Sequence, residues 1–216
     1  MNPRKAATAD IARMSDFFPK LTLTSREGTP LCFAGEIDIC DSTGVYWDTF
    51  KISIKAPANY PHGVPVVQET GSRIERIPDR HISPNGFCCV AIDHVLLHHA
   101  AKVLTVTEFV QRYVYPYLAN HLYFEREGHY ADQEYLHAFD GVQQFYRETM
   151  NAPDAATAIK LLESVLLRKL PSRNNLCFCG SLKKFKYCHM AASEYLSKIG
   201  YAKLKEDLHS FKNKDP

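Results

Sequence analysis

The first 70 residues show two different periods of hydrophobic positions. Apolar residues recur every three or four positions from 6 to 18, and Pro19 ends the pattern, which predicts an amphipathic helix. Residues 31–39 and 47–55 instead alternate between apolar and polar side chains. This period of two predicts two antiparallel strands, each with one face toward water.

Turn residues join these strands into a meander. The sequence at 41–44 favours a hairpin, and residues 64–67 predict a third, shorter strand after a proline-rich crossover at 57–65. Residues 90–102 are rich in His and Leu without a clear period, so we expect an irregular segment there.

Helical spacing returns in the second half of the chain. Thr105 and Glu108 have the spacing of a capping box and predict a helix that runs to about residue 122, with a kink at Pro116. Further helices are expected at 138–150, from Pro153 to about residue 170, and at 190–208.

Composition and charge are those of an ordinary globular protein, with 45% hydrophobic and 23% charged residues among 216. Neither a membrane span nor a signal peptide is visible, so a cytoplasmic protein without a membrane partner is expected. Residues 151–216 hold 12 basic and 6 acidic side chains, a net of +6, which leaves 14 minus 18, or −4, for the rest. A basic tail of this size is more often a solvated face than a nucleic-acid site, and nucleic-acid binding remains the lesser alternative.

Four soft metal ligands lie close together near the C-terminus: Cys177, Cys179, Cys188 and His189. Together with the neighbouring Cys-Gly-Ser and Lys-Lys-Phe-Lys segments, they resemble the SEC-C motif. The implied ion is Zn2+, held tetrahedrally by three thiolates and one imidazole in a closed, structural site. Residues 173–216 are too few to bury a sufficient core, and zinc can contribute roughly 10–16 kcal/mol to folding in small finger peptides.

A second group of thiols follows a turn in the middle of the chain. Pro84, Asn85 and Gly86 favour a sharp turn directly before Cys88 and Cys89, because Asn and Gly tolerate positive φ and Pro fixes its own φ. Such a turn would expose a thiol. The alternative is that both cysteines are small apolar residues entering the core, the commoner situation for a free cysteine.

The order of these elements resembles the ubiquitin-conjugating enzymes (UBC family) over residues 6–150. The shared motif residues are Tyr60-Pro61, Pro65 and Gly86, and Cys89 falls on the position of the family's nucleophile. The resemblance implies a UBC-like α+β fold, with an antiparallel meander packed against an N-terminal helix and C-terminal helices. It also implies that Cys89 forms a thioester with a partner's C-terminus and passes it to a lysine amine.

The resemblance assigns supporting roles to the residues around Cys89. Cys88 occupies the aliphatic position of the family motif and would pack inward, and Asn85 and Gly86 would support the loop. His81 stands eight residues before Cys89, where the family has the Asn of a His-Pro-Asn motif. Two alternatives remain for His81: it donates a hydrogen bond to the reacting carbonyl, or it packs the loop.

A further resemblance concerns the partner protein. Tyr135, His137, Gly141, Phe145 and Tyr146 resemble a pattern in bacterial family members of cyclic-oligonucleotide-based antiphage signalling (CBASS) operons. That resemblance implies a cGAS-like nucleotidyltransferase as the partner, and a ubiquitin-like protein C-terminus is the alternative. The activating enzyme would be a separate polypeptide, since no Gly-rich ATP-binding loop is visible.

The expected organisation has three parts: a catalytic domain at 1–150, a connecting helix at 151–172, and a zinc-stapled module with its tail at 173–216. The function expected from it is thioester transfer. The alternative is a non-catalytic adaptor that binds a ubiquitin-like or nucleotidyltransferase tail without forming a thioester.

Four other titratable residues are expected to be structural. His94 and His98 have i,i+4 spacing but no nearby Glu-rich motif, so a solvated helix face is expected rather than a metal site. Cys32 and Cys40 lie in or beside the first long strand and are expected to be core or sheet-surface thiols.

Overall fold

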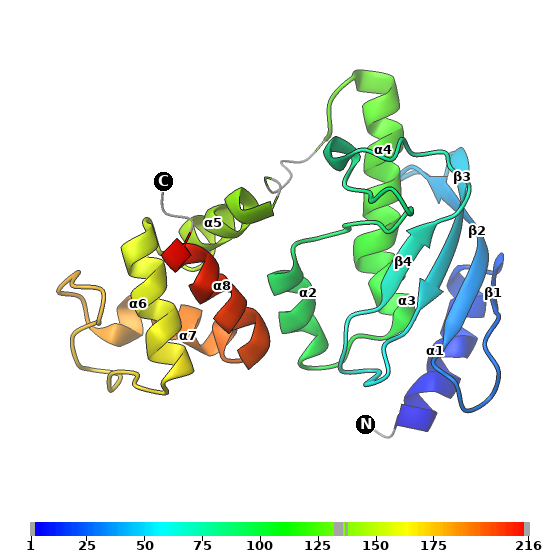
Figure 1. The fold of residues 1–216 in the computed structure, drawn as a ribbon. Coiled ribbons are helices and arrows are strands. Elements are labelled where there is room, and N and C mark those ends of the chain that lie inside the picture. The colour runs from blue at the N-terminus through cyan, green and yellow to red at the C-terminus, as the bar shows by residue number, and fades with distance from the viewer. Residues whose placement is uncertain (1–2, 132–135, 137, 214–216) are drawn as a thin grey trace. The chain divides into compact units, whose positions relative to one another are not determined.

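The computed structural model describes residues 3–131, 136 and 138–213 of the chain. The chain divides into two compact units, residues 1–134 and 135–216, whose elements are labelled in Figure 1. Each unit has a buried apolar core of its own. Among the residues that the structure describes, no helix combines the length and apolar character that a bilayer crossing requires.

The first unit is built on a four-stranded antiparallel sheet in the order β1-β2-β3-β4, so the predicted meander is confirmed. The hairpin between the two long strands closes at the predicted turn, where the N–H of Gly44 donates to the carbonyl of Asp41 at 3.0 Å. One short strand at the edge was not predicted, because three residues cannot display a period of two. The strands are β1 (Leu21–Leu23), β2 (Cys32–Cys40), β3 (Tyr46–Lys55) and β4 (Val66–Glu69).

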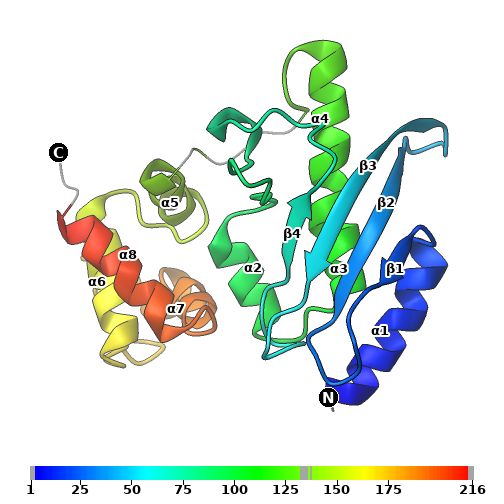
Figure 2. The same ribbon diagram turned by 45° about the vertical axis from the view of Figure 1, so that its right-hand side comes forward.

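One face of this sheet is buried and the other is largely polar, as the alternation predicts. Helix α4 (Tyr115–Glu127) packs against β2 and β3, and Figure 2 shows it passing behind the strands. Helix α1 (Pro3–Phe17) lies against β1 and α3 (Val106–Phe109). The buried side chains of the two long strands are Phe33, Ile37, Ile39, Phe50, Ile52 and Ile54.

A buried carboxylate joins α1 to the helical side of this unit. Asp10 accepts hydrogen bonds from the hydroxyl of Tyr60 at 2.7 Å and from the backbone N–H groups of Val106 and Thr107 at 2.6 and 3.0 Å. These two amides belong to the first turn of α3, where no intrahelical acceptor exists and a negative charge is favourable. One side chain therefore links α1, the crossover and α3.

The helix predicted from Thr105 is present but is not uniform. The Thr105 side chain accepts a hydrogen bond from the N–H of Glu108 at 3.2 Å, which confirms the cap. A π-helical turn (Val110–Val114) separates α3 from α4, and Pro116 follows in the first turn of α4. The irregularity expected at Pro116 thus takes the form of a π-turn directly before it.

The prediction of an irregular segment at 90–102 was wrong, because residues 93–100 form helix α2 (Asp93–Ala100). His94, Leu96 and Ala100 are buried. A helix of eight residues that buries a histidine beside its apolar residues shows little hydrophobic period in the sequence. His94 and His98 were expected to lie on a solvated helix face. This expectation is wrong for His94, because its side chain is buried.

The second unit is helical. The helix predicted at 138–150 is present, whereas the helix predicted at 190–208 is two helices separated by Gly200, whose φ of +108° is unfavourable for residues other than glycine. The helix expected from Pro153 begins two residues later, at Ala155, with Asp154 as its cap. The helices are α5 (Ala138–Glu148), α6 (Ala155–Leu166), α7 (Met190–Leu196) and α8 (Tyr201–Asn213).

Contacts of Tyr146 place α5 in this second unit. Its hydroxyl donates to the Asp207 carboxylate on α8 at 2.9 Å, and its ring lies edge-on to Phe211 with the centroids 5.1 Å apart. Helix α5 was expected to close the N-terminal domain, whose end was predicted at residue 150. The division lies instead between residues 134 and 135, because α5 forms its core with α8.

Candidate functional site

A short hydrogen-bonded turn carries the two central thiols. The N–H of Ser83 donates to the Phe87 carbonyl at 2.9 Å, the N–H of Gly86 donates to the Ser83 carbonyl at 2.8 Å, and the N–H of Cys89 donates to the His81 carbonyl at 2.8 Å. Residues 81–83 and 87–89 therefore run antiparallel, and the expected turn at 84–86 is present. The structure brings His81 and Cys89 together through their backbones.

This thiol hairpin, residues 81–89, extends the sheet beyond β4. The N–H of Cys88 donates to the carbonyl of Val67 at 3.0 Å, and the N–H of Glu69 donates to the carbonyl of Gly86 at 2.8 Å. The side chain of Gln68 donates to the carbonyl of Asn85 at 2.7 Å, so Asn85 supports the turn through its backbone. The hairpin is thereby attached to a rigid element on one side.

Gly86 is required at the tip of the hairpin. Its φ is +83°, and a Cβ at this position would lie only 2.5 Å from the backbone oxygen of Glu69. The buried Glu69 carboxylate in turn pairs with Arg76 at 2.6 Å, and the guanidinium also donates to the Glu69 carbonyl at 2.8 Å. This ion pair lies directly beside the glycine and fixes the approach of the hairpin to β4.

The two thiols differ in their environments because successive residues of an extended segment face opposite ways. Cys89 is exposed and Cys88 is half-buried. Burial raises the pKa of Cys88 to about 11. The pKa of Cys89 is also raised, first by partial desolvation and then by the nearby Asp93 carboxylate. Of the two sulfurs, Cys89 is therefore the one that a partner protein can reach.

A residue that the sequence analysis did not single out completes this site. Tyr117 on α4 is buried, and its hydroxyl donates to the carbonyls of Arg80 and His81 at 3.0 and 3.3 Å. In the sequence, Tyr117 is one member of the apolar stripe of a helix. Nothing in that pattern distinguishes it from a plain core residue.

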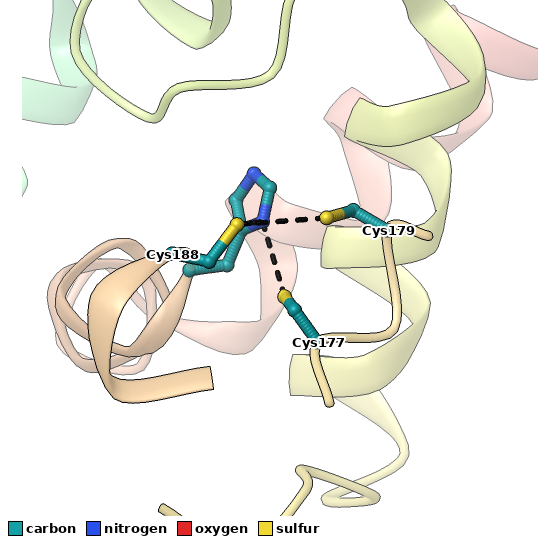
Figure 3. Close-up of side chains that lie close together, drawn as sticks. Cys177, Cys179 and Cys188 are labelled. Carbon is teal, nitrogen blue, oxygen red and sulfur yellow. Dashed lines mark hydrogen bonds between the residues drawn. The ribbon is translucent and has the colours of Figure 1, made fainter. Parts of the chain in front are cut away.

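The four predicted metal ligands converge in the loop between α6 and α7. The sulfurs of Cys177, Cys179 and Cys188 and a ring nitrogen of His189 all lie within 4.8 Å of one another, and Figure 3 shows the three cysteines pointing toward a common centre. A turn after Cys177 brings Cys179 back to the cluster, and a 3-10 turn (Phe185–Tyr187) delivers the Cys-His pair.

The spacing of these atoms suits a tetrahedral zinc ion. The His189 Nδ1 atom lies 3.3 Å from the Cys177 sulfur and 3.2 Å from the Cys188 sulfur, and the sulfurs of Cys179 and Cys188 are 3.5 Å apart. Zn–S bonds of about 2.3 Å and Zn–N bonds of about 2.0 Å put tetrahedral ligand atoms about 3.5–3.8 Å apart. Small shifts of these side chains would therefore accept the ion.

Contacts outside the cluster orient its imidazole. The Nε2 atom of His189 lies 2.8 Å from the carbonyl of Asn151, so this nitrogen carries the proton and Nδ1 is left to bind metal. Phe178 stacks on the imidazole ring, with the centroids 5.3 Å apart. The Asn151 carbonyl belongs to the turn between α5 and α6, where Asn151 has a φ of +55°. The cluster is thus built into the helical unit.

Comparison with known proteins identifies this segment. Residues 173–191 match the family model of the SEC-C motif. The chain carries a SEC-C motif. This motif is of a zinc-binding type, and its residues here form the Cys3His cluster that can hold a metal ion. No curated protein and no solved structure matches the chain.

The thiols of the SEC-C motif have different proton affinities in the metal-free protein. Burial raises the pKa of Cys177. Burial also acts to raise the pKa of Cys179, but hydrogen bonds from Ser181 and from the neighbouring thiols outweigh it, and the pKa lies below the ordinary value. Zinc binds thiolates, so the loading of this site must release at least the proton of Cys177.

The remaining candidate residues do not form a second metal site. Within the described ranges, the SEC-C cluster is the one group of three or more His, Cys, Asp or Glu ligands, so His94 and His98 lack a third. Cys32 and Cys40 are half-buried, as expected for sheet thiols. Tyr135 and His137 lie outside the described residues. Gly141 is explained by packing, since a Cβ there would lie 2.1 Å from the carbonyl oxygen of Leu136.

We expect purified protein to contain one zinc ion, measured by mass spectrometry of the metal, and Cys177→Ser to lose it. Cys32→Ser removes a thiol of the other unit and should retain the metal. Zinc should leave as the pH falls, because protons compete for the thiolates. Equal zinc content in wild type and Cys177→Ser at neutral pH would contradict a metal site at this cluster.

We also expect iodoacetamide to label Cys89 before Cys88. The rate at Cys89 should continue to rise above pH 8.5, since its raised pKa leaves it largely protonated at neutral pH, while Cys88 should stay almost unlabelled at pH 8. Fragment-ion mass spectrometry of the peptide distinguishes the two sites. Fast labelling that persists in Cys89→Ser and disappears in Cys88→Ser would reverse the assignment.

Proposed function

We propose that this protein is a UBC-like acyltransferase that carries the C-terminus of a partner protein on Cys89 and passes it to a lysine amine. The observation that carries the proposal is the position of the Cys89 sulfur. It is exposed at the end of a rigid hairpin, whereas the neighbouring Cys88 is turned toward the interior. A thiol that exchanges acyl groups between proteins must be reachable by both of them.

The order of elements supports this proposal. Helix α1, a four-stranded meander, the thiol hairpin and α2 to α4 follow one another as the resemblance to ubiquitin-conjugating enzymes implies. The turn that holds Cys89 is fixed by Gly86 and by hydrogen bonds to β4, so the nucleophile would be presented in one defined geometry. Pre-organisation of this kind lowers the barrier to a bimolecular transfer.

The proposed reaction has two steps. The Cys89 thiolate attacks a partner's C-terminal carbonyl that is already a thioester on a separate activating enzyme, and the thiolate of that enzyme leaves. A lysine amine then attacks the Cys89 thioester, so that a C–N bond forms, the C–S bond breaks and the amine proton passes to solvent. The raised pKa of Cys89 reduces the thiolate fraction but makes each thiolate more nucleophilic.

His81 is the proposed hydrogen-bond donor for the second step. Attack of the amine builds negative charge on the carbonyl oxygen, and a single placed donor there is commonly worth about 3 kcal/mol. His81 faces Cys89 across the hairpin, since its carbonyl accepts the Cys89 N–H. His81 stands at the position where the ubiquitin-conjugating enzymes have an Asn. Its imidazole would therefore donate the hydrogen bond that the Asn side-chain amide donates in that family.

The proposed partner is a cGAS-like nucleotidyltransferase in CBASS antiphage signalling, with a ubiquitin-like protein as the alternative source of the C-terminus. This part of the proposal is supported by the sequence at 135–146. The helical unit that contains the SEC-C motif would recruit the partner, and its zinc would be structural. Its four ligands leave no position for a catalytic water.

A peptide thioester tests the chemistry without knowledge of the partner. A Gly-terminated peptide with a mercaptoethanesulfonate leaving group should load wild-type protein and Cys88→Ser, and should not load Cys89→Ala. Transfer from loaded Cys89 to free lysine should be about a hundredfold faster than transfer from the same peptide on N-acetylcysteine. His81→Ala should lose most of this acceleration, measured by mass spectrometry of the amide product.

A transfer rate from Cys89 equal to that from N-acetylcysteine would contradict the enzyme and leave the adaptor function. An accelerated rate that His81→Ala leaves unchanged would show that His81 only packs the loop. The Cys88→Ser variant controls for general effects of mutating the hairpin, because it changes the neighbouring sulfur.

A further inference from the structure

The carbonyls of three consecutive residues that lead into the thiol hairpin are held by tyrosine hydroxyls. Tyr117 donates to the carbonyls of Arg80 and His81 at 3.0 and 3.3 Å, and Tyr130 donates to the carbonyl of Asp79 at 3.3 Å. This segment comprises a 3-10 turn (Pro78–Arg80) and His81, which ends it. The two tyrosines come from α4 and from the segment that follows it.

Aromatic contacts lock this arrangement. His121 lies one helical turn after Tyr117, and its ring is edge-on to Tyr117 and Tyr130 with centroid distances of 4.6 and 5.6 Å. Burial lowers the pKa of His121 to about 4, so the ring between the tyrosines is neutral at physiological pH. The Arg80 guanidinium lies 3.6 Å from the ring centroid of Phe124, also on α4.

The carbonyl of His81 is shared by the hairpin and by α4. It accepts the N–H of Cys89 at 2.8 Å and the hydroxyl of Tyr117 at 3.3 Å. His81 has a φ of +50°, a left-handed conformation that is uncommon for residues other than glycine. The Tyr117 hydroxyl is therefore placed to fix the backbone of His81 and, through one shared oxygen, its position relative to Cys89.

We infer that Tyr117 is a positioning residue for acyl transfer, which holds His81 in register with Cys89 through the carbonyls of residues 80 and 81. The inference rests on the proposed function of Cys89 and His81 and adds a residue on α4 to it. Tyr117 itself is buried, and its hydroxyl also interacts with the Cys88 thiol, so in this account it positions the hairpin and does not meet the acyl group or the amine. Its effect therefore requires His81, and it concerns the second step, because thioester exchange onto Cys89 needs only an accessible sulfur.

The test is Tyr117→Phe, which removes one oxygen and keeps the ring in the core. With the Gly-terminated peptide thioester, loading of Cys89 should stay within about twofold of wild type, while transfer to free lysine should slow about fivefold, the effect of one lost hydrogen bond. Lysine titration should show this loss in kcat. Tyr113→Phe is the matched control, because this hydroxyl lies 3.0 Å from the Nδ1 atom of His99 on α2, outside the hairpin.

A double variant tests whether Tyr117 acts through His81. Tyr117→Phe in the His81→Ala background should cause no further loss of transfer, since the group that it positions is already absent. Amide exchange of Cys89 should be faster in Tyr117→Phe than in Tyr113→Phe, which reports the loosened hairpin without any assay of activity.

Provided that wild-type protein shows accelerated transfer, three results would overturn the inference. The first is an unchanged transfer rate in Tyr117→Phe, and the second is an equal loss of transfer rate in Tyr113→Phe. The third is a double variant whose rate falls by the product of the two single-variant factors. If wild-type protein itself shows no accelerated transfer, the proposed function fails and the inference fails with it. The wild-type and variant rates therefore separate the two failures.

Discussion

The antiparallel pairing of residues 81–83 with 87–89 is the constraint on which the candidate active site depends. Because adjacent residues of a paired strand face opposite sides, this pairing directs one of two neighbouring thiols outward and the other inward. If the pairing shifted by one residue, Cys88 would face outward and Cys89 would face the interior. The register is held at the tip by Gly86, at the base by the Cys89–His81 hydrogen bond, and along one side by β4. The sheet thus acts as the rigid support for an exposed sulfur.

The metal cluster depends on a different constraint, namely the loop lengths inside the helical unit. A turn after Cys177 and a 3-10 turn before Cys188 bring three thiols together, and the Asn151 carbonyl, in the turn between α5 and α6, fixes the tautomer of His189. Sequence reasoning expected zinc to compensate for a module too small to form a core. The unit that contains the cluster comprises residues 135–216 and is larger than the expected module at 173–216. Helices α5 and α6 contribute Phe145, Tyr146 and Leu162 to its interior. We therefore expect zinc to stabilise mainly the loop that binds it, because the helices of this unit bury a core of their own.

Much of the fold could be predicted from local pattern, and the remainder depends on contacts between distant residues. The period of two in β2 and β3, the Thr105 cap and the spacing of the four metal ligands are local features, and the structure bears them out. Strand β1 is too short to show an alternation of apolar and polar residues. Helix α2 shows no clear helical period of apolar residues, because one of its buried positions is a histidine. The placement of α5 with α8 depends on a Tyr146–Asp207 contact 61 residues apart in the sequence. Tyr117 was missed for the same reason, since its hydroxyl acts on carbonyls of another segment.

The most direct test of the central claim is to trap the acyl group on residue 89 in the native host. Cys89→Ser should accumulate an adduct of higher mass that survives reductant, is cleaved by mild alkali and maps to residue 89, because an oxygen ester is less readily cleaved by amines than a thioester. Wild-type protein should show a reductant-sensitive adduct, and Cys89→Ala none. Its mass would identify the partner. Absence of any adduct in Cys89→Ser, or an adduct that persists in Cys89→Ala, would contradict acyl transfer through Cys89.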